Sequence, residues 1–246
     1  YPIFTGEADT EIMRIEAPNT RITGLEFTGA AATRAILIYS GIAGAFSNIV
    51  IADNYMHDIN FNWTLEDAPE EADMALLTEE EVQKVCPDSR SGYGTGGIGT
   101  SHHSSELIGP TWFENMWISG NVIERVARGG MFLSAGWARR PGWEWGANKY
   151  HSDEVGYYPN RNVYVVGNTV RYTGGDGIVL LHTDGGYIEG NTVYHAQFLG
   201  RNADTSGQAA YNVAIWSHSC NNVVYQYNEA AYTHKRNNAG DGQGFD

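Results

Sequence analysis

Three aspartates in this 246-residue chain stand where a carboxyl group could do chemistry. Asp176, Asp241 and Asp246 lie next to or near glycines, and a backbone without side chains lets a sugar approach closely. Cleavage of a glycosidic bond needs two carboxyl groups, one as the acid and one as the base or nucleophile. We therefore expect a catalytic pair drawn from these three aspartates. The competing interpretation is that Asp176 and Asp241 only form turns through their side chains.

Three histidines form a second group of candidates. His182 is a candidate catalytic residue, because histidine can act as an acid or a base near neutral pH. His102 and His218 occupy comparable positions in the repeat described below and are candidates for substrate binding. The three side chains could therefore line one face. The alternative is that each is a surface histidine that only hydrogen-bonds its neighbours.

A segment rich in tryptophan and arginine could hold a glycan. Aromatic faces stack on the apolar face of a sugar ring, and guanidinium groups bind carboxylates through paired hydrogen bonds. The alternative is that these aromatic side chains pack against the rest of the molecule as a small core of their own. The candidate substrate-binding residues are Trp137, Arg139, Arg140, Trp143 and Trp145.

An internal repeat must position all of these residues. Segment 121–133 matches segment 168–180 without a gap at an offset of 47, and the pattern returns after 23 and then 37 more residues. Each copy joins short strands through corners of Asn and Gly, which tolerate left-handed backbone. One copy cannot bury its inward side chains alone, so successive copies must stack. The repeat predicts an all-β fold, a right-handed parallel β-helix, with a ladder of corner asparagines: Asn54, Asn121, Asn168, Asn191 and Asn228.

Three insertions interrupt the repeat, within a single domain expected to span residues 1–246. They cover residues 63–96, 136–160 and 197–211, and loops of this length usually carry function. Thr78 and Glu81 have the spacing of a capping box, which predicts one short helix. The chain stops within a strand of the repeat, so we expect further segments of the same protein to stack on it.

Composition argues against several classes of protein. The formal net charge of −14, from 15 basic and 29 acidic residues, repels a phosphate backbone, so we expect no nucleic-acid partner. No run of 18 apolar residues occurs, so we expect no membrane-spanning helix. Cys86 and Cys220 lack the spacing of a zinc site and could either bridge or stay reduced. We predict no metal site and no cofactor, with a structural or catalytic calcium ion left open.

Three features carry a resemblance to a known family. Residues 174–178 (Gly-Gly-Asp-Gly-Ile), the repeated Gly-Asn-Thr-Val corners and residues 240–246 resemble the pectate-lyase-like β-helix superfamily. Within it, the chain looks most like secreted bacterial β-helix proteins that degrade glycans. The resemblance covers residues 19–246 and implies the fold and a secreted, periplasmic or cell-surface location. The superfamily includes hydrolases, lyases, epimerases and non-catalytic adhesins, so the resemblance leaves the reaction open.

The motifs of two member groups are missing. Polygalacturonase-type hydrolases carry an Asp-Asp pair where this chain has only Asp176, and we find no calcium-binding acidic clusters of the pectate-lyase kind on consecutive coils. We expect a glycoside hydrolase that cleaves a poly- or oligosaccharide with an aspartate acid/base pair. One alternative is a polysaccharide lyase on a uronate-containing polymer, using His182 or the turn at 234–236. Another is a non-catalytic glycan-binding module.

Overall fold

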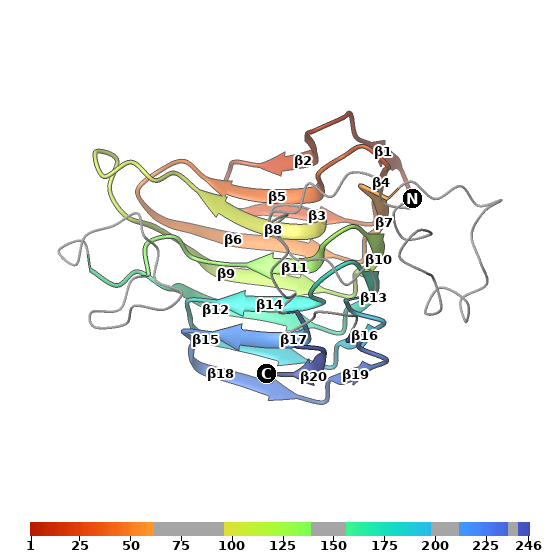
Figure 1. Cartoon of the computed structure of the whole chain (residues 1–246). Helices are drawn as coiled ribbons and strands as arrows, with labels where there is room; N and C mark the ends of the chain where they lie inside the picture. Colours follow the sequence, from red (N-terminus) through yellow and green to blue (C-terminus); the bar gives the residue numbers. More distant parts are fainter. Residues whose placement is uncertain (62–95, 139–155, 198–211, 236–240) are drawn as a thin grey trace, which may run out of the picture.

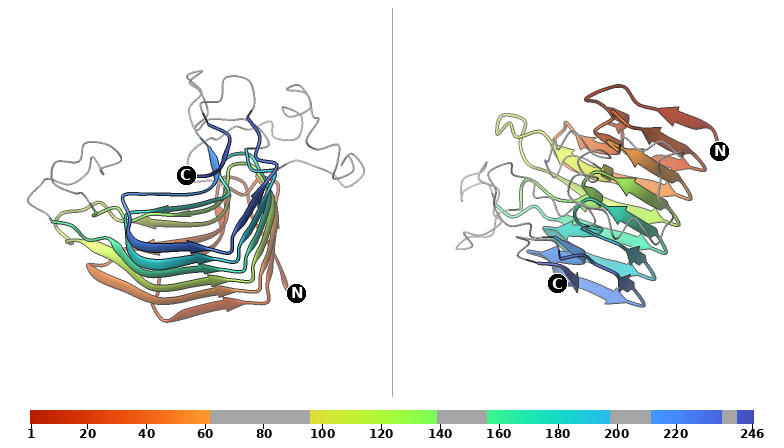
Figure 2. Two further views of the ribbon diagram at one scale, coloured as in Figure 1. Left: turned by 90° about the horizontal axis from the view of Figure 1, so that it is seen from below. Right: turned by 45° about the vertical axis from the view of Figure 1, so that its right-hand side comes forward.

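The computed structural model describes residues 1–61, 96–138, 156–197, 212–235 and 241–246. These residues form twenty β-strands and no helix. Every third strand along the chain joins the same sheet, where it pairs in parallel with the strand of the preceding coil. The result is a stack of coils with three sides, a parallel β-helix, as the repeat predicts (Figures 1 and 2).

Three sheets, named A, B and C, form the three sides. Sheet A contains β1 (Ile3–Thr5), β4 (Glu26–Gly29), β7 (Tyr55–Ile59), β10 (Val122–Val126), β13 (Thr169–Thr173), β16 (Thr192–Tyr194) and β19 (Glu229–Ala231). Sheet B contains β2 (Glu11–Ile15), β5 (Arg34–Ser40), β8 (Gly96–His102), β11 (Gly129–Leu133), β14 (Ile178–Leu181), β17 (Val213–His218) and β20 (Gln243–Phe245). Sheet C contains β3 (Thr20–Thr23), β6 (Gly44–Ala52), β9 (Thr111–Ser119), β12 (Asn160–Val166), β15 (Thr183–Glu189) and β18 (Asn221–Gln226).

The spacing of the repeat sets the register between coils. Val122 pairs with Thr169, which pairs with Thr192. Thr192 in turn pairs with Glu229, so the offsets of 47, 23 and 37 are all present in sheet A. Coils of such different length keep the same register because the additional residues fall between strands in the sequence. These intervals follow β7, β16 and β19 on the way to sheet B, and β11 on the way to sheet C. The predicted short helix and most of the three predicted insertions fall there, outside the described residues.

A ladder of asparagine side chains, all buried except the half-buried Asn228, holds the corner between sheets C and A. Asn121 Oδ1 accepts hydrogen bonds from the main-chain N–H and from Nδ2 of Asn54, at 3.1 and 3.0 Å. The same two bonds join Asn121 to Asn168, Asn168 to Asn191, and Asn191 to Asn228. The predicted corner role is therefore confirmed, and the ladder satisfies amides that would be costly to bury alone.

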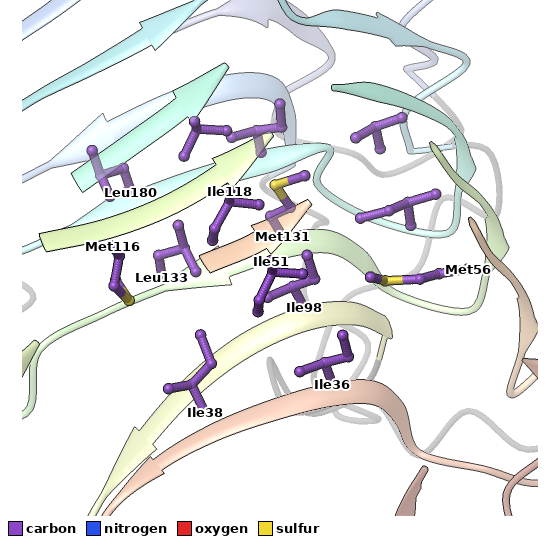
Figure 3. Close-up of a cluster of buried hydrophobic side chains, with 14 of the residues drawn as sticks. Ile36, Ile38, Ile51, Met56, Ile98, Met116, Ile118, Met131, Leu133 and Leu180 are labelled. Atoms are coloured by element: carbon purple, nitrogen blue, oxygen red, sulfur yellow. The ribbon is translucent and has the colours of Figure 1, made fainter. Parts of the chain in front are cut away.

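The interior is filled by aliphatic side chains that stack in rows along the axis. Ile36, Ile98, Met131 and Ile178 are register partners on successive strands of sheet B, and none is more than 2 % exposed. Figure 3 shows members of these rows together with side chains that face them from the other sheets. Because the inner faces are packed, a binding surface on these coils must use an outer face or a corner.

Candidate functional site

Predicted site residues from distant parts of the sequence lie along the two edges of sheet B. Its strands are parallel, so their first residues share one edge and their last residues share the other. Asp176 and Asp241 precede β14 and β20 by two residues and lie at the first edge. At the second edge lie His102, His182 and His218, each the last residue of a strand or the next one after it. Asp246 follows β20 but lies level with Trp216, two residues before this edge.

Asp176 is buried at the first edge, with 2 % of its surface exposed. Its Oδ1 accepts hydrogen bonds from the main-chain N–H of Val213 (2.9 Å) and from Nε1 of Trp216 (2.8 Å), both in the next coil. Arg128 Nη2 lies 3.9 Å from the other carboxylate oxygen. Burial raises the pKa of Asp176 above its ordinary value, although these neighbours favour the charged form. A sugar at the surface would not reach this carboxyl group, so the geometry favours a structural role over the predicted catalytic one.

Asp246 is the most exposed of the three predicted aspartates. Its N–H donates to Ile215 O, and its carbonyl oxygen accepts from the N–H of Ser217, each at 3.3 Å. These bonds place Asp246 beside Trp216 of the preceding coil. Phe245 pairs with the buried Ile215, and side chains alternate along a strand, so Asp246 points to the outer face of sheet B.

A hollow of about 450 Å³ opens beside Asp246 at the last described coil. Among the described residues that line it, Asp246 is the only carboxylate. The lining residues are Ile215, Tyr225, Gln226, Tyr227, Asn228, Phe245 and Asp246.

The three aspartates do not form a close pair. Asp241 and Asp246 are five residues apart on one extended segment, which separates their Cα atoms by roughly 16 Å. Asp176 lies two coils away and three residues nearer the first edge, on the order of 14 Å from Asp246 between Cα atoms. His218 is nearer, one coil away and two residues along, at on the order of 8 Å. Cα separations of roughly 14 to 16 Å are long for two carboxyl groups that must stand about 5 to 9.5 Å apart. Of these predicted residues, His218 has its Cα atom nearest to that of Asp246.

The three predicted histidines share the second edge but differ in exposure. The His102 ring lies over Gly136 of the next coil. A Cβ atom on residue 136 would lie 1.3 Å from Nε2 of His102, so only glycine fits there. Burial lowers the pKa of His102. His182 is 4 % exposed, and its Nδ1 lies 3.4 Å from Ser134 Oγ in the same coil as Gly136. His102 and His218 are both half-buried, and the side chain of His218 points to the outer face because it lies two residues after the outward-facing Trp216.

Trp137 does not offer a face for stacking on a sugar, contrary to the prediction. It is 1 % exposed, its Nε1 donates to His103 O at 3.1 Å, and the two rings lie 5.7 Å apart. This packing agrees with the alternative that aromatic side chains of the segment form a small core of their own. The other predicted members of the group lie outside the described residues: Arg139, Arg140, Trp143 and Trp145.

Three further residues at sheet B were not predicted from the sequence. Arg34 and Arg128 are 6 % and 3 % exposed, and each side chain lies over a glycine of another coil, Gly99 and Gly175. Burial lowers the pKa of Arg34 to about 10. Trp216 lies on the outer face, between Asp176 and Asp246. The signal for the two arginines is a glycine opposite a long side chain, which can be recognised only once the register between coils is known.

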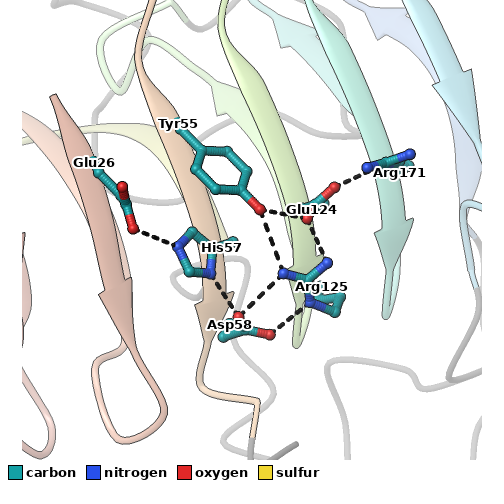
Figure 4. A network of polar contacts seen from close by, with 7 residues as sticks. All are labelled: Glu26, Tyr55, His57, Asp58, Glu124, Arg125 and Arg171. Atoms are coloured by element: carbon teal, nitrogen blue, oxygen red, sulfur yellow. Dashed lines mark hydrogen bonds and ion pairs between the residues drawn. The ribbon is translucent and has the colours of Figure 1, made fainter. Parts of the chain in front are cut away.

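A second polar cluster covers part of the outer face of sheet A (Figure 4). Glu124 accepts a hydrogen bond from the hydroxyl of Tyr55 at 2.6 Å and pairs with Arg125 and Arg171. Asp58 accepts from Arg125 Nε at 2.7 Å. Burial would raise the pKa of both carboxyl groups, but these hydrogen bonds and cations outweigh it and lower both pKa values. Each carboxylate is matched by a cation, so the cluster favours a structural role.

The described residues bear on three further expectations, for metal ions, membrane-spanning helices and cysteines. Within the described ranges, no three His, Cys, Asp or Glu side chains gather closely enough to hold a metal ion. The same ranges contain no helix with the length and apolar character needed to cross a membrane. Cys220 Sγ lies 3.4 Å from the carbonyl oxygen of Leu180, while Cys86 lies outside the described residues. The choice between a bridge and two thiols therefore stays open.

Two solved structures share this fold. The native GH136 lacto-N-biosidase from Eubacterium ramulus matches with a TM-score of 0.60 at 17 % identity, over 89 % of this chain and 34 % of that one. Its selenomethionine derivative matches with a TM-score of 0.56 at 18 % identity, over 85 % and 32 %. Both are glycoside hydrolases. The chain spans about a third of the length of these proteins. At 17 and 18 % identity, the similarity shows a shared fold alone. No family model and no curated protein matches the sequence.

Proposed function

We propose that this chain is a glycoside hydrolase domain and that its glycan binds across the outer face of sheet B. The placement of Asp246 carries the proposal, because an exposed carboxylate stands there beside Trp216 and one coil from His218. The fold shared with a lacto-N-biosidase supports the same class of reaction. A location outside the cytoplasm belongs to the proposal, since the resemblance is to secreted proteins that degrade glycans.

In this proposal Asp246 and His218 are the acid/base groups. The carboxylate of Asp246 activates a water molecule or stabilises the positive charge that develops on the sugar ring. The imidazole of His218, when protonated, donates to the leaving oxygen. Trp216 lies next to Asp246 and offers aromatic surface to a sugar. Asp176 is a positioning residue, because it fixes the indole N–H of Trp216.

A polysaccharide lyase has less support from the geometry. Its predicted base His182 is 4 % exposed, and His234 Nε2 lies 3.1 Å from His195 Nδ1 on the side of sheet A. Neither histidine stands beside Asp246 on the outer face of sheet B.

Replacing the proposed acid/base groups tests the proposal. We expect Asp246→Asn to lower kcat by about 10²-fold or more, and His218→Gln by at least about tenfold, because each removes a proton-transferring or charge-stabilising group. Asp241→Asn is the matched control and should keep its activity, since Asp241 is roughly 16 Å from Asp246. The assay follows sugar release from a panel of oligosaccharides that includes a chromogenic lacto-N-bioside, with thermal unfolding as a check on folding.

The same assay separates the competing functions. Activity lost in Asp241→Asn but kept in Asp246→Asn would reverse the assignment of the carboxylate. An unsaturated product absorbing in the ultraviolet would establish a lyase. Absence of product from every glycan in the panel, with binding retained, would indicate a non-catalytic module.

A further inference from the structure

The outer face of sheet C carries a row of aromatic side chains that the proposed hydrolysis does not use. Trp117, Tyr164 and Tyr187 are register partners on β9, β12 and β15, and we call this row the sheet C stripe. Each aromatic residue stands four positions before a corner asparagine of its own coil, so the repeat itself places the three rings in single file. Val224 continues the row on β18.

The rings of the sheet C stripe are open to solvent. Trp117 and Tyr187 are 43 % and 41 % exposed. The ring centroids are 4.8 Å apart between Trp117 and Tyr164, and 5.9 Å apart between Tyr164 and Tyr187, with interplanar angles of 32° and 12°. Nearly parallel rings at 5.9 Å are offset and not eclipsed, so part of each ring face stays uncovered. These uncovered ring faces are therefore available to a ligand that stacks on aromatic rings.

A second ladder of asparagines runs alongside the stripe. Asn48, Asn115 and Asn162 are exposed and all have positive φ, so their side chains leave the sheet at equivalent points. Asn115 Nδ2 donates to Asn48 Oδ1 at 3.3 Å, and Asn162 Nδ2 donates to Asn115 Oδ1 at 3.0 Å. Asn115 and Asn162 each stand two residues before an aromatic residue of the sheet C stripe, and Asn48 stands two residues before Val50, the register partner of Trp117. Uncharged amides next to aromatic rings match a ligand that presents hydroxyl groups and apolar ring faces.

We propose that the sheet C stripe binds a neutral polysaccharide chain that runs along the axis of the coil stack. The stripe is one side chain wide and three coils long, which suits a polymer, whereas a globular partner needs about 800 Å² on each side. The stripe and its asparagine ladder carry no charge, and the chain as a whole carries −14, which disfavours an anionic polymer. Sheets B and C are different sides of the stack, so this site is separate from Asp246 and would anchor a long substrate.

Binding to neutral polysaccharides tests this proposal. The probes are hydroxyethylcellulose, galactomannan and a mixed-linkage β-glucan, with polygalacturonate as the anionic comparison. We expect the chain to bind at least one neutral probe, and Trp117→Ala and Tyr187→Ala each to weaken that binding by about tenfold. Tyr232→Ala is the matched control, because Tyr232 is an aromatic residue 71 % exposed beside sheet A. It should bind as the unmodified chain does.

The result is independent of the proposed hydrolysis. Asp246→Asn should keep its affinity for the polymer, and Trp117→Ala should cleave a short chromogenic glycoside as fast as the unmodified chain. A loss of polymer binding can then be traced to the sheet C stripe, and a loss of hydrolysis to Asp246. Failure of the chain to bind any neutral probe would overturn the proposal, and so would stripe variants that bind as tightly as the unmodified chain. A dimer that the stripe variants convert to a monomer, with polymer binding unchanged, would also overturn it and identify the face as a contact between copies.

Discussion

Asn168 lies in the middle of the buried ladder and makes hydrogen bonds that neither alanine nor aspartate can reproduce. It accepts from the N–H and Nδ2 of Asn121 and donates to Ile118 O and Asn191 Oδ1. We expect Asn168→Ala to lower the free energy of unfolding by about 2 to 5 kcal/mol, because it leaves buried amide and carbonyl groups without partners. Urea-induced unfolding followed by circular dichroism measures the loss.

An asparagine of the exposed ladder provides the matched control for this substitution. Asn162 donates to Asn115 Oδ1 at the surface, and its φ of 53° is one that glycine adopts without strain. Asn162→Gly should change the free energy of unfolding by less than about 1 kcal/mol, because water replaces the lost bond. Equal losses in the two variants would show that burial of the ladder contributes little.

At the scale of elements, sheet A carries an ion-pair cluster that should make stability depend on pH. Burial alone would lower the pKa of His57, but hydrogen bonds to Asp58 and Glu26 outweigh it and raise the pKa. The protonated imidazole is therefore the form that stabilises the fold. This contribution is complete below the unfolded-state pKa of about 6.5 and is lost as the pH rises through the folded-state value.

We therefore expect His57→Gln to flatten the pH dependence of the melting temperature. The difference in Tm between the unmodified chain and the variant should be largest below a pH of about 6.5 and should shrink as the pH rises above it. Differential scanning calorimetry at several pH values gives both curves. Parallel curves over this range would mean that His57 titrates with the same pKa in the folded and unfolded chain.

The register of the strands and the corners between them could be predicted from the sequence. Offsets of 47, 23 and 37 identified the register of sheet A, and the register brought His102, His182 and His218 to one edge of sheet B. Alternation along strands and the corner asparagines depend on local spacing, which is visible in one sequence. The aromatic residue four positions before the corner was visible too, although its meaning required knowledge that the face stays uncovered.

Burial was the part that local spacing could not predict. The glycines around Asp176 suggested room for a sugar, but Gly175 instead accommodates the side chain of Arg128. Asp176 itself is bonded to Trp216, which lies 40 residues further along the chain. Trp137 likewise packs against His103 of the preceding coil. Such contacts depend on which side chains of other coils fill a given space, and a search for repeats does not contain that information.

At the scale of the whole molecule, each coil contacts only its neighbours, so stability should vary along the stack. Strands β10 and β13 pair on both sides, and their side chains Ile123 and Val170 are fully buried. In the described part of the chain, β1 and β20 pair on one side, with Ile3 61 % and Phe245 49 % exposed. For the 246-residue chain studied by itself, we expect opening to begin at β1 and β20 and to reach the central coils last.

Hydrogen exchange followed by mass spectrometry tests this order. Amides of β10 and β13 should exchange more slowly than those of β1 and β20, because opening a central coil breaks two interfaces whereas opening an end coil breaks one. Uniform protection in all coils would mean that the stack opens as a single cooperative unit. The order bears on the proposed function, since Asp246 follows β20. A glycan bound across sheet B would therefore slow exchange in β20 more than in β10 or β13, provided that it contacts Asp246 and Trp216 together.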